Sequence, residues 1–228
     1  AGKTLQDALV AWGQSAPDIL VKLIDARDRL SLQVHPDDAY AAKVGQRGKT
    51  ELWHILDAAP GAGIYLGVKE SVSREEFKRH ISENTVERIL RWVPVKAGES
   101  YYIPAGTLHA IGAGCLIYEV QQSSNLTYRV YDYGRLGADG KPRQLHIEDA
   151  LAVSVLSHVD TSPLGRNEAE GIIADCPYFT LRELIVEKDI PFSAPEGSFC
   201  HLLCTEGDVS ASKGENNYVW YQKRLREF

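Results

Sequence analysis

Short runs in which hydrophobic and polar residues alternate dominate the first two thirds of the chain. The runs LVKLIDA and LSLQVH follow one another from about residue 20, and a period of two is typical of β-strands with one buried face. In the second run the aliphatic and polar positions fall on opposite faces, Leu32 and Val34 on one, and Ser31, Gln33 and His35 on the other. This pattern predicts the wall of a barrel or sandwich whose polar side encloses something other than a hydrophobic core.

The segments ESYYIPAG, CLIYEVQQSS and LTYRVYDY also have the alternating pattern of β-strands, and glycine and proline mark the turns between them.

Helical spacing of apolar residues is confined to three other segments. A short amphipathic helix is expected over residues 4–12, and HIEDALAVSVL predicts a helix near residues 146–156. The segment VSREEFKRHISENTVERILRWV, with Ser73 and Glu76 as a capping box, predicts a helical insertion over about residues 72–92.

Beyond about Ser157 the pattern is weaker, although YFTLRELIVEKDIPF predicts one or two further strands. We therefore expect a mainly β protein with two domains. Residues 1–156 would form a jelly-roll barrel with inserted helices, and residues 157–228 a second, smaller β domain.

Composition and charge narrow the classes of function. Hydrophobic residues make up 44% and charged residues 25% of the 228 positions, which is the balance of a globular protein rather than a disordered or collagen-like one. The 25 basic and 31 acidic residues give a net charge of −6 without a basic stripe, which argues against nucleic-acid and membrane partners. No apolar run approaches the roughly 18 residues of a membrane span, and the first residues lack a signal-peptide pattern, so a cytoplasmic protein is expected.

Four polar residues in separate segments could share a metal ion. Gln33 and His35 lie two positions apart on one strand face, so both can converge on one ion. Glu51 starts the strand-like segment ELWHI, and the turn at Pro104–Gly106 in PAGTLHAIGAG aims His109 inward. Each residue alone has a structural explanation, such as a solvated strand face or a hydrogen-bonded core histidine. Together they make a set of two nitrogen and two oxygen ligands that suits zinc and leaves room for a substrate oxygen.

The segments LSLQVHPDD, GKTELWHI, PAGTLHAIGAG and YEVQQSSNLTYRVYDYGR, in this order, resemble the signature segments of short bacterial mannose-6-phosphate isomerases, which are members of the cupin superfamily. The resemblance runs from about Gly2 to about Ser154. It implies a cupin barrel, and it implies a stretch upstream and a longer carboxy-terminal β domain than residues 157–228 supply. It also implies one Zn²⁺ per chain on the glutamine and histidine of QVH, the glutamate of KTE and the histidine of PAGTLH. In this sequence these are Gln33, His35, Glu51 and His109.

The activity that this resemblance implies is isomerisation between mannose 6-phosphate and fructose 6-phosphate by proton transfer through an enediol, a step of carbohydrate metabolism. It implies that Arg129 is the active-site arginine, and that Ser31 and Lys69 lie near the substrate phosphate. Lys49, two residues before Glu51, and Glu119 are both candidates for the proton-transfer group, and the sequence does not choose between them.

Two other classes of function compete with the isomerase. A non-catalytic cupin could bind a sugar phosphate as a regulatory module, although it would need no proton-transfer group. A metal-dependent cupin oxygenase would favour a histidine-rich iron site, which Gln33 speaks against. A small sugar phosphate is the expected partner, and the expected assembly is a monomer or a homodimer.

Overall fold

The computed structural model describes residues 7, 9–10, 13, 17–137, 140–191, 199–213 and 216–221. The chain forms two compact units, Gln14–Arg182 and, separately, Ala1–Gly13 with Glu183–Phe228. The helix expected over residues 4–12 lies mostly outside the described residues. Within the described ranges, no helix has the length and apolar character needed to cross a membrane.

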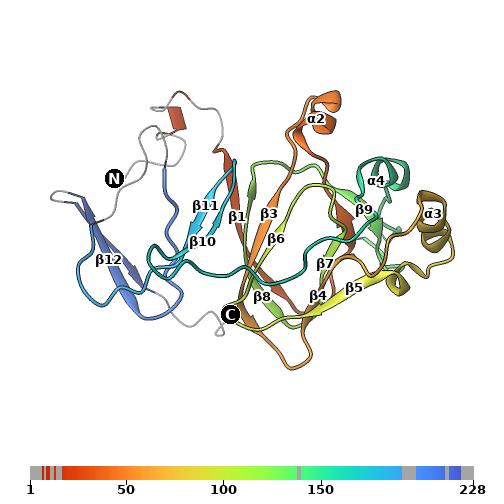
Figure 1. Cartoon of the computed structure of the whole chain (residues 1–228). Helices are drawn as coiled ribbons and strands as arrows, with labels where there is room; N and C mark the ends of the chain where they lie inside the picture. The colour runs from red at the N-terminus through yellow and green to blue at the C-terminus, as the bar shows by residue number, and fades with distance from the viewer. Residues whose placement is uncertain are drawn as a thin grey trace. The chain divides into compact units, whose positions relative to one another are not determined.

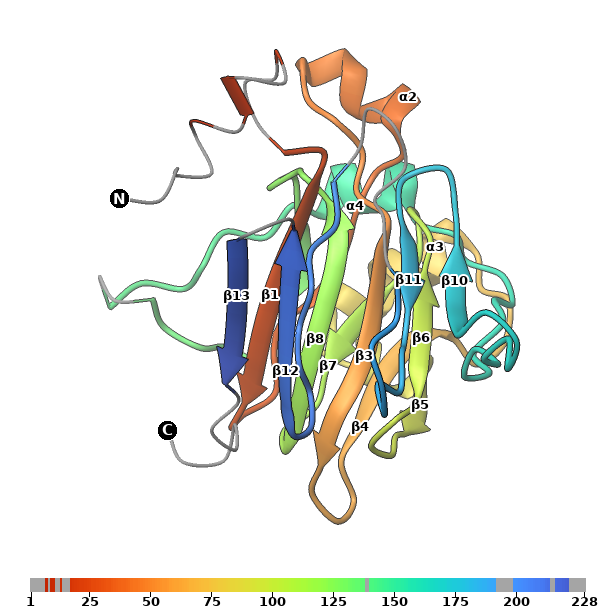
Figure 2. The same cartoon turned by 90° about the vertical axis from the view of Figure 1, so that its left-hand side faces the viewer.

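The larger unit is a β barrel made of two antiparallel sheets (Figure 1). The four-stranded sheet, seen face-on in Figure 2, has the order β1 (Ile19–Ala26), β8 (Cys115–Gln122), β3 (Glu51–Ala58), β6 (Ser100–Ile103). The five-stranded sheet has the order β5 (Leu90–Pro94), β4 (Gly63–Val68), β7 (His109–Ile111), β2 (Leu32–Val34), β9 (Tyr128–Tyr131). The mainly β class with inserted helices is thereby confirmed.

Two hydrophobic cores lie on opposite faces of the five-stranded sheet. Between the sheets, one buried cluster joins side chains from both, among them Trp53, Ile64, Tyr101 and Ile117. On the other face, helices α3 (Arg74–Ser82) and α4 (Ile147–Val153) cover the sheet, as Figure 1 shows. Leu32 and Val34 belong to this second cluster and are fully buried. Because side chains alternate along a strand, the polar face of β2 looks between the sheets, as its sequence pattern predicts.

The helical insertion is shorter than its apolar spacing predicts. The Ser73 hydroxyl accepts a hydrogen bond from the Glu76 N–H at 3.0 Å, as expected of a capping box, but α3 ends at Ser82. Asn84 follows with φ of 56°, a left-handed conformation that interrupts the helix. After the short 3-10 helix η2 (Val86–Arg88), Leu90 pairs with Val68 of β4. The prediction of helix up to residue 92 is therefore wrong beyond η2, because Leu90 is buried by a strand.

Short helices and two hairpins make up the remaining elements. Helix α2 (Asp38–Ala41) and the 3-10 helix η1 (Ala42–Val44) follow β2, and the hairpin of β10 (Ile172–Asp175) and β11 (Thr180–Arg182) ends the larger unit. The smaller unit contains the hairpin of β12 (Asp208–Lys213) and β13 (Asn216–Tyr221). The expected strand at β11 is confirmed, whereas residues 184–190 form none. The division into domains at residue 156 stays a prediction.

A sharp turn before β7 fixes the approach of that strand. Gly106 has φ of +87°, its N–H donates to the His35 carbonyl at 2.8 Å, and its own carbonyl accepts from the Val155 N–H at 2.8 Å. A Cβ atom at this position would lie 3.0 Å from the Val153 carbonyl oxygen and from Val155 Cγ2. The turn therefore requires glycine for its backbone conformation and for the close approach of the chain after α4.

We expect Gly106→Ala to destabilise the protein more than Gly98→Ala. Gly98 has nearly the same φ, +88°, but a Cβ atom added to it would have nothing within 4 Å. Both variants strain the backbone by about 1–2 kcal/mol, and only the first also displaces its neighbours. Urea unfolding of the two variants measures the difference, and equal losses would show that the contact with Val153 has no energetic consequence.

Candidate metal centre

Three buried side chains from three strands converge between the sheets. His35 follows β2, Glu51 is the first residue of β3, and His109 is the first residue of β7. The His35 Nε2 atom lies 3.3 Å from Glu51 Oε1, and the His109 Nε2 atom lies 3.4 Å from Glu51 Oε2. One possible ligand atom from each residue lies within 4.8 Å of the others, and no side chain of the three is more than 1% exposed.

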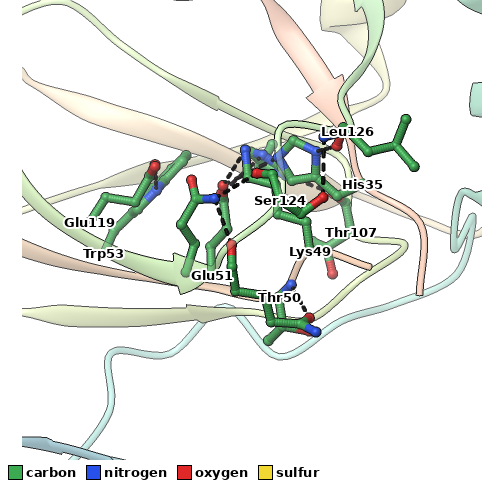
Figure 3. Close-up of polar contacts among 12 residues, drawn as sticks. His35, Lys49, Thr50, Glu51, Trp53, Thr107, Glu119, Ser124 and Leu126 are labelled. Carbon is green, nitrogen blue, oxygen red and sulfur yellow. Dashed lines mark hydrogen bonds and ion pairs between the residues drawn. The ribbon is translucent and has the colours of Figure 1, made fainter. Parts of the chain in front are cut away.

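The two imidazole rings are held by backbone carbonyls on their far sides. His35 Nδ1 lies 3.0 Å from the Leu126 carbonyl oxygen, a contact drawn in Figure 3, and His109 Nδ1 lies 2.8 Å from that of Thr107. Because a carbonyl oxygen only accepts, each Nδ1 carries the hydrogen and each Nε2 presents a lone pair to the carboxylate. Burial lowers the pKa of His35 to about 4 and also lowers the pKa of His109. Both rings are therefore neutral at neutral pH, the form that binds metals.

The cluster leaves buried polar atoms without hydrogen bonds. His35 Nε2, His109 Nε2 and Glu51 Oε2 have no hydrogen-bond partner. Such atoms cost about 1–3 kcal/mol each when nothing compensates them. Here all three face the same space, and a divalent cation would satisfy them together. Two neutral imidazoles and a carboxylate are ligands that suit zinc and related ions, so the residues fit a metal.

The strand register brings two further predicted residues beside the cluster. Gln33 of β2 pairs with His109 of β7 on one side and with Arg129 of β9 on the other. Residues directly opposite one another in an antiparallel pair point to the same face of the sheet. Gln33 and Arg129 therefore share the inner face with His109, next to the three converging side chains.

Lys49 is buried beside the carboxylate of the cluster. It is 5% exposed, and its Nζ atom lies 2.9 Å from Glu51 Oε1. Burial acts to raise the pKa of Glu51, but the groups that face its carboxylate, among them the Lys49 ammonium, outweigh burial and hold this pKa well below its usual range. Glu51 is consequently ionised. Figure 3 shows these side chains together, with Lys49 close to Glu51.

Glu119 belongs to a polar network of its own on the inner face of the four-stranded sheet. One carboxylate oxygen lies 2.7 Å from Lys22 Nζ, and the other accepts a hydrogen bond from Trp53 Nε1 at 2.8 Å. Lys22 also donates to Gln121 Oε1 at 2.5 Å. Lys22 was not predicted from the sequence, although a lysine that alternates with Leu20 and Ile24 on one strand face is a recognisable signal.

Arg129 and Ser31 lie on the polar side of the sheet, whereas Lys69 is directed elsewhere. Ser31 is buried directly before β2. The Arg129 Nη1 atom donates to the Gln144 carbonyl at 3.0 Å, while its Nε is buried without a hydrogen-bond partner. Lys69, exposed after β4, donates from Nζ to the Arg88 carbonyl at 2.9 Å. The structure therefore does not bring the Lys69 amino group to the cluster.

Three arginines and one aspartate gather at the end of β9. Arg143 Nε lies 2.6 Å from Asp132 Oδ2, and Arg135 Nη2 lies 2.5 Å from Asp132 Oδ1. Burial and the neighbouring Arg143 lower the pKa of Arg129. Since one carboxylate faces three guanidinium groups, this edge of the barrel carries excess positive charge and suits an anionic ligand.

The barrel has the cupin fold, and its buried His35, Glu51 and His109 could hold a metal ion. In sequence and fold the chain is a relative of the mannose-6-phosphate isomerases. It is 42% identical over 168 residues to the mannose-6-phosphate isomerase of Streptococcus mutans, covering 72% of this chain and 53% of that protein. It is 47% identical over 144 residues to a probable mannose-6-phosphate isomerase of Bacillus subtilis, covering 62% of this chain and 45% of that protein.

Solved structures agree with this relationship. The crystal structure of mannose 6-phosphate isomerase from Bacillus subtilis matches with a TM-score of 0.67 and 37% identity over 77% of this chain and 59% of that chain. A putative mannosephosphate isomerase from Archaeoglobus fulgidus has the same fold, with a TM-score of 0.57 and 24% identity over 73% of this chain and 51% of that chain. No protein-family model matches the chain. The chain spans about half the length of the curated relatives it matches.

We expect Asp132→Asn to destabilise the protein by about 2 kcal/mol at pH 7, because it removes a charged acceptor from two arginines. Burial acts to raise the pKa of Asp132, but the hydrogen bonds from Arg143 and Arg135 outweigh it, and the pKa is lowered. An unfolded aspartate takes up its proton near pH 3.9, while the folded one is still ionised. The ionised Asp132 therefore contributes fully to the free energy of unfolding above that pH. Its contribution falls as the pH decreases through the lower folded pKa.

Urea unfolding of the wild type and Asp132→Asn between pH 7 and pH 3 measures this dependence. The difference in unfolding free energy should shrink on the acid side. A difference that stays constant over the whole range would contradict the lowered pKa.

Proposed function

We propose that this protein is a metal-dependent aldose–ketose isomerase that interconverts mannose 6-phosphate and fructose 6-phosphate. The observation that carries the proposal is the buried convergence of His35, Glu51 and His109, with ligand atoms that lack hydrogen bonds. The activity for which the relatives are named supports the choice of substrate. We further propose one zinc ion per chain, held by these three residues and by Gln33, which lies opposite His109 on the neighbouring strand.

The isomerisation moves a proton between C1 and C2 of the sugar phosphate through an enediol. A bound divalent ion supplies Lewis-acid stabilisation of the negative charge that develops on the substrate oxygen. The chain must supply a group that carries the proton. We assign this role to Lys49, because its Nζ atom is buried at the carboxylate of the cluster, 2.9 Å from Glu51, where a bound substrate would lie.

The anionic end of the substrate requires a cationic side chain. Arg129 meets this requirement, since it lies on the inner face beside Gln33 and its Nε is buried without a hydrogen-bond partner. Ser31 lies directly before the same strand and would add a hydroxyl donor. For Lys69, a contact with phosphate stays a prediction that requires its amino group to leave the Arg88 carbonyl.

The purified chain should convert mannose 6-phosphate to fructose 6-phosphate, lose this activity on chelation and regain it with added zinc. A coupled spectrophotometric assay measures the turnover, and metal analysis measures the zinc content. Protein that holds one zinc ion and binds mannose 6-phosphate without turnover would contradict the proposal. That outcome would favour the non-catalytic sugar-phosphate-binding cupin.

Lys49→Met should lower kcat by about 100-fold or more while zinc stays bound, because the ligand atoms are unchanged and only the proton carrier is lost. Lys78→Met is the matched control, since Lys78 forms an exposed ion pair with Glu148 on the helical side of the barrel. Steady-state kinetics and the zinc content of both variants test whether Lys49 carries the proton. Near wild-type kcat in Lys49→Met would remove Lys49 from the proton transfer.

A further inference from the structure

The side chain of Trp53 links Glu119 to His109 of the candidate metal centre. The indole Nε1 donates to Glu119 Oε2 at 2.8 Å, and the indole ring meets the His109 ring edge to face, with centroids 5.4 Å apart and an interplanar angle of 79°. Trp53 is fully buried. Figure 3 shows Glu119 and Trp53 together at one side of Glu51.

This contact supports the orientation of a metal-ligating ring. The His109 ring is held at one edge by the Thr107 carbonyl, and the indole of Trp53 lies against the ring itself. An edge-to-face aromatic pair of this separation contributes about 0.5–1.5 kcal/mol. The hydrogen bond from the one polar atom of the indole to Glu119 holds the ring in this direction.

The surroundings of Glu119 are those of a structural acceptor. It is 3% exposed, and both oxygens already accept, one from Trp53 and the other from Lys22 at 2.7 Å. Lys22 anchors the carboxylate in turn and is itself held by Gln121. A general base must instead lie within hydrogen-bond distance of the proton it removes, and the buried group at the cluster is Lys49.

We propose that Glu119 is a positioning residue, which orients His109 through the indole of Trp53, and that it does not carry the substrate proton. The proposal rests on the proposed function, because it assumes that His109 binds the metal. It resolves the choice between Lys49 and Glu119 that the sequence leaves open.

Glu119→Gln separates the two roles, because glutamine keeps an oxygen that accepts from Trp53 but does not act as a carboxylate base. The side chain of Lys22 is 38% exposed and keeps its contact with Gln121, so a neutral neighbour is tolerated. Glu119→Ala and Trp53→Phe each break the hydrogen bond to the indole. Tyr65→Phe is the matched control, since it removes one hydrogen bond, to Glu87, on the other side of the sheet.

Zinc affinity is measured by competition with a chromophoric chelator, and kcat/KM is measured across pH. Glu119→Gln should keep zinc affinity within about twofold and retain the wild-type pH profile. Glu119→Ala and Trp53→Phe should each weaken zinc binding about tenfold, as is typical when a partner that orients a metal ligand is lost. Because both substitutions remove the same hydrogen bond between Trp53 and Glu119, the double variant should bind zinc no more weakly than either single variant.

The proposal is overturned if Glu119→Gln abolishes turnover with unchanged zinc affinity, since this is the result expected of a base. It is equally overturned if the zinc affinity of Trp53→Phe equals that of the wild type and of the control variant Tyr65→Phe. Wild-type protein that binds zinc without turnover would refute the isomerase alone, because the affinities still test the positioning. Wild-type protein that binds no zinc would overturn both.

Discussion

The carboxylate of Glu51, fully buried between the two sheets, is the constraint around which the barrel is arranged. An isolated charge at such a site would be strongly unfavourable, and removing one partner of a buried ion pair typically costs about 3–5 kcal/mol. The protein meets this cost with the ammonium group of Lys49 at 2.9 Å, while the two neutral imidazoles direct their lone pairs into the same space. A cation between them would satisfy the lone pairs that lack hydrogen-bond partners, so stability and metal binding depend on the same atoms.

Backbone hydrogen bonds between loops hold together the strand ends that carry His35, Glu51 and His109. The Gly106 N–H donates to the carbonyl of His35, and the Lys49 N–H donates to that of Pro36. Each loop that carries a ligand is thus joined to the end of β2. Such links hold the side chains in place before a metal arrives, which reduces the loss of conformational entropy on binding.

The barrel and the convergence of His35, Glu51 and His109 could be predicted from the sequence because both depend on local patterns. Alternation in LSLQVH fixed the faces of Leu32 and Gln33, and the turn before His109 has few other conformations. The end of α3 was not predictable in this way. Leu90 continues the helical spacing, and only its pairing with Val68, more than twenty residues earlier, makes it a strand residue. Long-range pairing also created the contact of Lys22 with Glu119, which no local pattern contains.

The same distinction explains why the sequence offered two proton carriers. Lys49 and Glu119 are both polar residues at positions that face the interior of the barrel, and the alternation of faces alone makes them equally good candidates for the proton-transfer group. What separates them is the partner of each buried charge. Lys49 faces Glu51, whose carboxylate would be shared with a metal, so its environment changes when the site is filled. Glu119 faces Lys22 and Trp53, neither of which offers the metal a ligand atom, so its environment stays the same. A group that must gain and lose a proton during a reaction belongs in the first setting, and a group that must hold a ring still belongs in the second.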